Sequence, residues 1–191
     1  MRIGVLAMQG AFREHKWAIE RLGEEAVEVR LPHHLKDVDG IIIPGGESTT
    51  IGKLLNRYKL MEPIKELAAK GIPIMGTCAG MILLAKDIIG SEQPRLGFMD
   101  ISVVRNGFGR QVESFEVDLD INAIGRVPFH AVFIRAPYVK NMEPQVGILA
   151  QVEEKVVMAR QGNFLACAFH PELTEDDRVH SYFLKMVKEN L

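Results

Sequence analysis

Apolar and polar residues form blocks of two different periods along the first 85 positions of the chain. Short apolar runs predict buried strands, and segments with apolar residues three to four positions apart predict helices. In chain order, the blocks predict a strand at 2–8, a helix at 11–22, strands at 25–31 and 39–43, helices at 49–57 and 63–70, a strand at 72–77 and a helix after it. Apolar strands that alternate with helices are typical of a parallel sheet covered on both faces.

The pattern changes after residue 95, where apolar runs are joined by short polar turns instead of helices. These runs predict strands at 96–105, 112–119, 131–135, 146–152, 155–160 and 164–169, before a final amphipathic helix at 174–190. Strands joined by short turns pair antiparallel. We therefore predict an α/β fold with a three-layer, doubly wound, mixed and mostly parallel sheet, an antiparallel extension, and a single domain over residues 1–191.

Composition and charge narrow the range of functions. The 191 residues carry a formal net charge of −2, which gives no electrostatic case for binding nucleic acid or an anionic membrane. No apolar run approaches the roughly 20 residues that a membrane-spanning helix needs, and the first eight residues are too short for a signal peptide. With only Cys78 and Cys167, the chain has no disulfide framework, so we expect a cytoplasmic protein.

The segment Gly76-Thr77-Cys78-Ala79-Gly80 lies between a predicted strand and a predicted helix. A nucleophile on such a sharp turn is strained and closely flanked by backbone, which is why glycines are needed on both sides. The helix N-terminus favours a thiolate there, and its free N–H groups can stabilise an oxyanion. A cysteine between glycines can also be an inert, buried core residue.

A nucleophilic cysteine requires a base, and His170 is the best candidate. It ends the apolar strand 164–169, and Pro171 stiffens the turn that brings Glu172 within reach of the imidazole. The remaining histidines, His15, His33, His34, His130 and His180, are expected to be packed or solvated, without a metal. Cys167 is expected in the core.

The glycine loop Gly45-Gly46-Glu47-Ser48 follows the third predicted strand. It differs from a phosphate-binding loop by one residue of spacing and by Leu54 in place of the magnesium-binding hydroxyl. We therefore expect it to offer N–H donors to a substrate carbonyl, and Ser48 to cap the helix that follows.

Three motifs together resemble the class I (triad) glutamine amidotransferases: Gly-Thr-Cys-Ala-Gly at 76–80, Pro-Gly-Gly-Glu-Ser at 44–48 and His-Pro-Glu at 170–172. Further segments resemble the glutaminase subunits of pyridoxal 5′-phosphate synthases, and they cover essentially the whole chain: 5–15, 44–50, 105–111, 114–116 and 133–137. The departures are Met8, where the family more often has Leu, and Gly107, where Ala is frequent.

The resemblance implies hydrolysis of L-glutamine to glutamate and ammonia, without a cofactor or metal. Cys78 would attack the side-chain amide, His170 would move the proton, and Glu172 would hold His170. Backbone N–H groups of Gly46 and Ala79 would form the oxyanion hole. The residues implied in glutamine recognition are Gly46, Glu47, Ser48, Arg105, Ile134 and Arg135.

These recognition roles make chemical sense, but alternatives stay open. Arginine can clamp the substrate α-carboxylate, Glu47 can pair with the α-ammonium group, and the main chain at Ile134 can fix the orientation. Arg105 and Arg135 could equally be solvated residues at strand ends.

The resemblance also implies a partner, the synthase subunit, which would receive ammonia through a tunnel. We expect the contact to include residues 9–15, although this segment could simply begin an ordinary amphipathic helix. The alternatives to this function are the glutaminase subunit of another amidotransferase, a cysteine peptidase or thiol stress protein on a similar sheet, and an inactive binding module.

Overall fold

The computed structural model of the chain describes residues 1–109 and 113–191. The strands are β1 (Arg2–Leu6), β2 (Glu25–Val29), β3 (Gly40–Ile43), β4 (Ile74–Thr77), β5 (Ala85–Ile88), β6 (Met99–Val104), β7 (Ser114–Leu119), β8 (Phe129–Ile134), β9 (Tyr138–Met142), β10 (Gly147–Val152), β11 (Lys155–Gln161) and β12 (Phe164–Cys167). The helices are α1 (Phe12–Arg21), α2 (Ser48–Arg57), α3 (Met61–Ala69), α4 (Ala79–Leu84) and α5 (Arg178–Lys188). The first position of the strand predicted at 112–119 lies outside the described residues.

The main sheet has the strand order β2-β1-β3-β4-β12-β11-β9-β6-β5, and β10 pairs with β11. The five strands from β2 to β12 in this order are parallel, and β11 and β9 run antiparallel to their neighbours. The register sets Ile43 beside Gly76, and Thr77 beside Cys167. The loops after β3, β4 and β12 therefore emerge side by side at one edge of the sheet.

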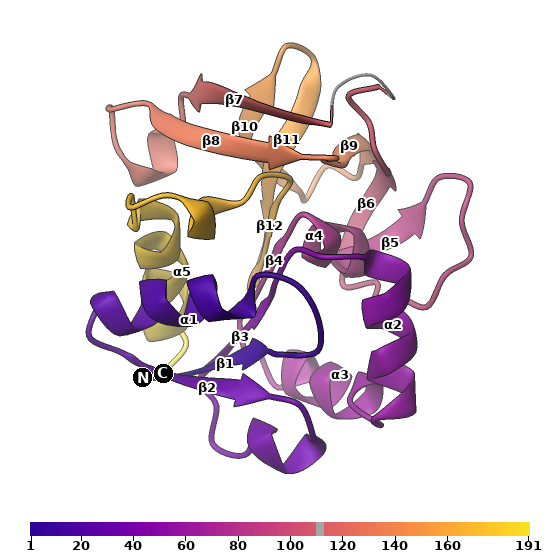
Figure 1. Ribbon diagram of the computed structural model, residues 1–191, viewed down its shortest axis with the longest axis vertical. Coiled ribbons are helices and arrows are strands. Elements are labelled where there is room, and N and C mark those ends of the chain that lie inside the picture. The colour runs from indigo at the N-terminus through magenta and orange to yellow at the C-terminus, as the bar shows by residue number, and fades with distance from the viewer. Residues whose placement is uncertain (110–112) are drawn as a thin grey trace.

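Helices cover both faces of the parallel half of the sheet (Figure 1). Helices α1 and α5 lie on one face, while α2, α3 and α4 lie on the other. Gly40 in β3 lets α5 approach closely, because a Cβ atom there would lie 2.7 Å from a methyl carbon of Val187. This arrangement confirms the predicted three-layer, mixed and mostly parallel α/β fold.

The second half of the chain differs from the prediction in strands β5 and β9 and in the start of the last helix. The short strands β5 and β9 were not predicted, because their exposed positions, such as Lys86, Asp87 and Lys140, interrupt the apolar runs. The last helix begins at Arg178 instead of residue 174. A side-chain carboxylate of Asp176 accepts a hydrogen bond from the Arg178 N–H, so the chain turns before the helix begins.

Strands β7 and β8 form a separate antiparallel hairpin beyond the end of the main sheet (Figure 1). Stacked rings of Phe115 and Phe133 hold its two strands together, and Phe133 also packs against Phe169. The Val132 carbonyl accepts a 2.8 Å hydrogen bond from the His170 N–H. The hairpin is thereby tied to the turn that carries His170.

Within the described residues, no helix is both long and apolar enough to cross a membrane.

Candidate active site

The loops after β3, β4 and β12 enclose a cavity of about 250 Å³ at the carboxyl edge of the parallel strands. Pockets for drug-sized ligands span roughly 300–1,000 Å³, so this one suits a smaller molecule. Its lining consists of Gln9, Gly46, Glu47, Ser48, Cys78, Ile82, Arg105, Asn106, Ile134, Arg135 and His170. All the residues expected in catalysis or recognition are here except Ala79 and Glu172, which are buried next to Cys78 and His170.

Cys78 has the strained backbone expected of a nucleophile on a sharp turn. Its φ of +49° and ψ of −101° are unusual for a residue with a side chain, and such strain costs about 1–3 kcal/mol. The flanking glycines are sterically required, because a Cβ at Gly80 would lie 2.2 Å from the Ile43 carbonyl oxygen. A Cβ at Gly76 would lie 2.5 Å from the backbone of Gly80. Cys78 Sγ faces the Ile134 carbonyl oxygen at 3.8 Å.

His170 and Glu172 form a buried pair, with Nδ1 and Oε1 separated by 2.7 Å. Burial disfavours the imidazolium, but the neighbouring Cys78 and Glu172 outweigh it and raise the pKa of His170 to about 10. Burial would also raise the pKa of Glu172, yet the adjacent imidazoles of His15 and His170 hold that pKa below its usual value. The site therefore favours an ionised Glu172 beside a protonated His170.

The start of helix α2 corrects the prediction that Ser48 caps it. The capping residue is Glu47, whose carboxylate accepts hydrogen bonds from the N–H groups of Thr49 at 3.0 Å and Thr50 at 2.8 Å. Ser48 is the first helical residue and is buried. Burial is the largest single influence and would raise the pKa of Glu47, but the hydrogen bonds from Thr49 and Thr50 together outweigh it and lower the pKa to about 2. The Glu47 N–H in turn donates to Gln9 Oε1 at 2.7 Å.

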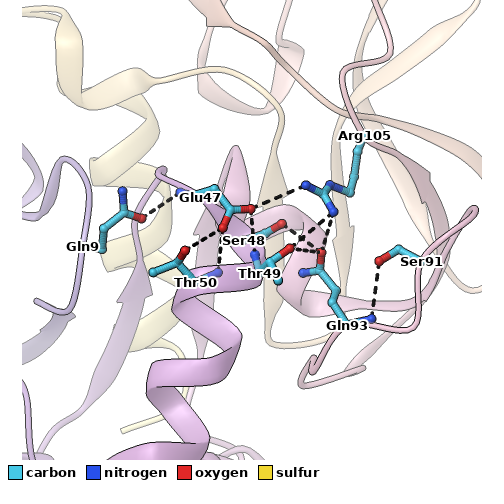
Figure 2. A network of polar contacts seen from close by, with 8 residues as sticks. All are labelled: Gln9, Glu47, Ser48, Thr49, Thr50, Ser91, Gln93 and Arg105. Atoms are coloured by element: carbon cyan, nitrogen blue, oxygen red, sulfur yellow. Dashed lines mark hydrogen bonds and ion pairs between the residues drawn. The ribbon is translucent and has the colours of Figure 1, made fainter.

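Gln93, which the sequence did not mark, anchors Arg105 at the cavity (Figure 2). Its Oε1 accepts from Arg105 Nη1 at 3.0 Å, and also from the hydroxyls of Ser48 and Thr49. Since arginine only donates, the amide must present its oxygen here. Arg105 Nη2 also lies 3.5 Å from Glu47 Oε1. The guanidinium is thus held next to the glycine loop by residues far apart in sequence.

The opposite wall comes from the ends of β6 and β8. Asn106 and Arg135 both have positive φ, at +49° and +43°, and both line the cavity. The Arg135 side chain is exposed, and it makes no hydrogen bond or ion pair with any residue that the structure describes. Arg135 therefore brings a second cation to the cavity.

Three buried polar residues, Thr77, His15 and His180, lie behind the triad, and no pattern in the sequence indicated the two histidines. His15 and His180 were expected to be packed or solvated on their helices, and both are completely buried. His15 Nε2 lies 3.0 Å from Thr77 Oγ1 and 3.3 Å from Glu172 Oε2. The spacing of residues along a helix cannot show that a side chain has a polar partner on another element. Only the tertiary structure therefore identifies this cluster.

The segment expected to contact a partner, residues 9–15, divides between surface and interior. Gln9 lines the cavity and Arg13 is exposed. His15 cannot belong to a docking surface, because none of its surface is accessible. This part of the prediction is therefore wrong for His15. Among the described residues, no group of three or more His, Cys, Asp or Glu is arranged to hold a metal ion.

Comparisons with known proteins agree with this geometry. A crystal structure of a glutamine amidotransferase superposes with a TM-score of 0.93 at 52% identity, covering 97% of this chain and 98% of that one. The pyridoxal 5′-phosphate synthase subunit PdxT of Moorella thermoacetica is 64% identical over 98% of this chain and 100% of its own length. The PdxT of Carboxydothermus hydrogenoformans is 61% identical, with both chains fully covered. The model of the SNO glutamine amidotransferase family matches residues 5–189, and the chain belongs to this family.

Proposed function

We propose that this chain hydrolyses L-glutamine to L-glutamate and ammonia as the glutaminase subunit of a pyridoxal 5′-phosphate synthase. One observation carries the proposal: a strained Cys78 and the buried His170–Glu172 pair meet at a cavity that also holds two arginines. Relatives named as subunits of that synthase, covered over nearly their whole length, support the biological context.

Glutamine would lie with its side-chain amide at Cys78 and its amino-acid end toward Arg105 and Arg135. A guanidinium binds a carboxylate with two parallel hydrogen bonds, so either arginine can hold the α-carboxylate. Glu47 is 49% exposed and ionised, so its negative charge can attract the α-ammonium group at the cavity while its oxygens cap α2. Ser48 and the Ile134 main chain would fix the orientation.

The chemistry would proceed through a glutamyl thioester. His170 takes the proton of the Cys78 thiol as Sγ attacks the amide carbon, and it donates that proton to the departing ammonia as the C–N bond breaks. Water, deprotonated by His170, then cleaves the thioester to glutamate and regenerates the thiol. Glu172 keeps His170 in the tautomer and orientation that these transfers require, as the carboxylate of a catalytic triad does.

The tetrahedral intermediates require donors for an oxyanion. We assign these to the backbone N–H groups of Gly46, which lies in the glycine loop, and of Ala79, which follows the nucleophile. The φ of Gly46, +152°, is a value that residues with a side chain rarely adopt, which supports a special role for this peptide.

A synthase subunit would receive the ammonia, and the exposed part of residues 9–14 is the proposed contact. We also propose a single glutaminase domain, because β1 and β12, strands from opposite ends of the chain, belong to the same main sheet. Both cysteines are free thiols, which supports the cytoplasm as its location.

The test is glutamate release from glutamine, measured with and without the synthase subunit. We expect synthase-stimulated release that Cys78→Ala abolishes and that Cys167→Ala, a matched change in the core, preserves. Hydrolysis by Cys78→Ala at the wild-type rate would refute the mechanism. An active glutaminase that the synthase does not stimulate would point to another amidotransferase, and peptide cleavage without glutamine hydrolysis would point to a peptidase.

A further inference from the structure

Glu172 has two carboxylate oxygens, and the triad uses only one of them. Oε1 faces His170 Nδ1 at 2.7 Å, while Oε2 is buried and has no well-aligned hydrogen bond. His15 Nε2 lies 3.3 Å from Oε2. An ionised oxygen buried without a partner is costly, so this contact must be favourable for the carboxylate to persist.

The neighbours of His15 determine its tautomer. A bare Nε2 would direct its lone pair at the Glu172 carboxylate, so Nε2 must carry the hydrogen. The same nitrogen makes a hydrogen bond with Thr77 Oγ1 at 3.0 Å and lies 3.3 Å from Glu172 Oε2, so its hydrogen faces both oxygens. His15 Nδ1 then has to accept, and its partner at 2.9 Å is His180 Nε2.

His180 fits this assignment. If its Nε2 donates to His15, its Nδ1 carries only a lone pair, and that atom is the buried one without a hydrogen-bond partner. The opposite tautomer would place an N–H donor there, and orphaned buried N–H groups are rarer than orphaned acceptors. Burial lowers the pKa of both imidazoles, that of His180 to about 3, so both are neutral at pH 7.

We propose that His15 is a positioning residue for glutamine hydrolysis, which holds Glu172 through Oε2 while His180 fixes the tautomer of His15. The inference rests on the proposed glutaminase function. With both oxygens held, the carboxylate cannot rotate away from His170. A neutral donor does this without adding a positive charge that would compete with the His170 imidazolium for the same carboxylate.

The cluster also explains why α1 and α5 both supply a histidine to the interior. The two imidazoles meet edge to face with ring centres 5.1 Å apart. The helices that carry them, α1 and α5, lie on the sheet face opposite α4. Helices α1 and α5 therefore support the triad from behind, on the side away from the cavity.

The test compares two substitutions at the same position in the complex with the synthase. His15→Leu fills the volume but removes the donor, whereas His15→Gln keeps an N–H group at about the place of Nε2. Because hydrogen bonds to charged groups are the strong ones, we expect His15→Leu to lower kcat by about 10- to 100-fold. We expect the KM for glutamine to stay within about twofold of wild type, since His15 lies outside the cavity lining.

His15→Gln should recover at least about a third of the wild-type kcat, and His180→Leu should lower kcat in the same direction as His15→Leu. His130→Gln, a change at an exposed histidine, is the matched control and should leave kcat unchanged. Melting temperatures separate positioning from folding. Equal losses of kcat and of melting temperature in His15→Leu and His15→Gln would overturn the proposal, because a purely structural role predicts that result.

A second readout does not depend on glutamine. Iodoacetamide alkylation of Cys78, followed by mass spectrometry of its peptide, reports how well His170 activates the thiol. We expect slower alkylation in His15→Leu and near-normal alkylation in His15→Gln. If this pattern appears in a protein that does not hydrolyse glutamine, the proposed function fails while the positioning role stands. Wild-type alkylation in His15→Leu would overturn the positioning role.

Discussion

Gly45→Ala tests whether catalysis depends on the position of the His170 ring. A Cβ atom at Gly45 would lie 2.3 Å from His170 Cε1 and 2.9 Å from Nδ1. The φ of Gly45 is outside the left-handed region, so alanine fits the backbone, and the clash with the imidazole is the main effect. The substitution therefore acts on one catalytic side chain.

The magnitude follows from the distances. Ordinary contacts begin at 3.4 Å, so the new methyl is too close to Cε1 by about 1.1 Å. A displacement of about 1 Å at a catalytic group costs on the order of 100-fold in rate, which corresponds to about 2.7 kcal/mol of barrier. Overpacking should destabilise the fold by about 1–3 kcal/mol.

The assay is steady-state glutaminase kinetics with the synthase present, beside thermal unfolding. We expect kcat to fall about 100-fold while the protein remains folded. Gly147→Ala is the matched control, because its nearest new contact is an ordinary 3.6 Å and its φ is also outside the left-handed region. A Gly45→Ala enzyme with kcat within threefold of wild type would show that His170 tolerates the shift, and would refute the reasoning.

Three further substitutions test other parts of the site. Glu172→Gln should lower kcat by about three to four orders of magnitude in the glutaminase assay, because the amide cannot hold the His170 imidazolium; a loss below tenfold would contradict this. Gln93→Ala should raise the KM for glutamine about tenfold with little change in kcat, because Arg105 loses its 3.0 Å anchor; an unchanged KM would remove Arg105 from glutamine binding. Glu47→Ala should lower the free energy of unfolding by about 1 kcal/mol at pH 7 through loss of the α2 cap. Since the pKa of Glu47 is lowered to about 2, its contribution is present above pH 4.5 and is lost as the pH falls through 2, so denaturant unfolding should show the two proteins converging in acid.

The parallel half of the fold was predictable because its strands are continuous apolar runs. In segments such as Gly40–Ile43, the run of apolar residues clearly indicates a buried strand, and a glycine loop follows it. The chemistry of the site was visible for the same reason, since Cys78 and His170 follow such strands directly. Strands β5 and β9 were missed because sheet pairing, and not burial of every side chain, stabilises them.

The functional residues that the sequence did not reveal hold other side chains in place and do not line the cavity themselves. Gln93 resembles an ordinary loop residue, and its role depends on Arg105, twelve positions later. His15 and His180 are 165 positions apart and become partners only when α1 and α5 pack on the same face. Local patterns carry no information about such pairs, because polar residues on a helix are usually solvated.

Backbone strain gives an independent argument for where this protein acts. Six residues other than glycine have positive φ in the part of the chain that the structure describes, and three of them, Cys78, Asn106 and Arg135, line the cavity of the candidate active site. Each such conformation costs of order 1–3 kcal/mol and persists only where the surroundings impose it. Tight glycine contacts impose it at Cys78, and pairing between the β7–β8 hairpin ends imposes it at Arg135, whose N–H donates to Glu113. The strain is therefore concentrated at the nucleophile and at the cation proposed to hold the substrate, where a fixed geometry contributes most to catalysis.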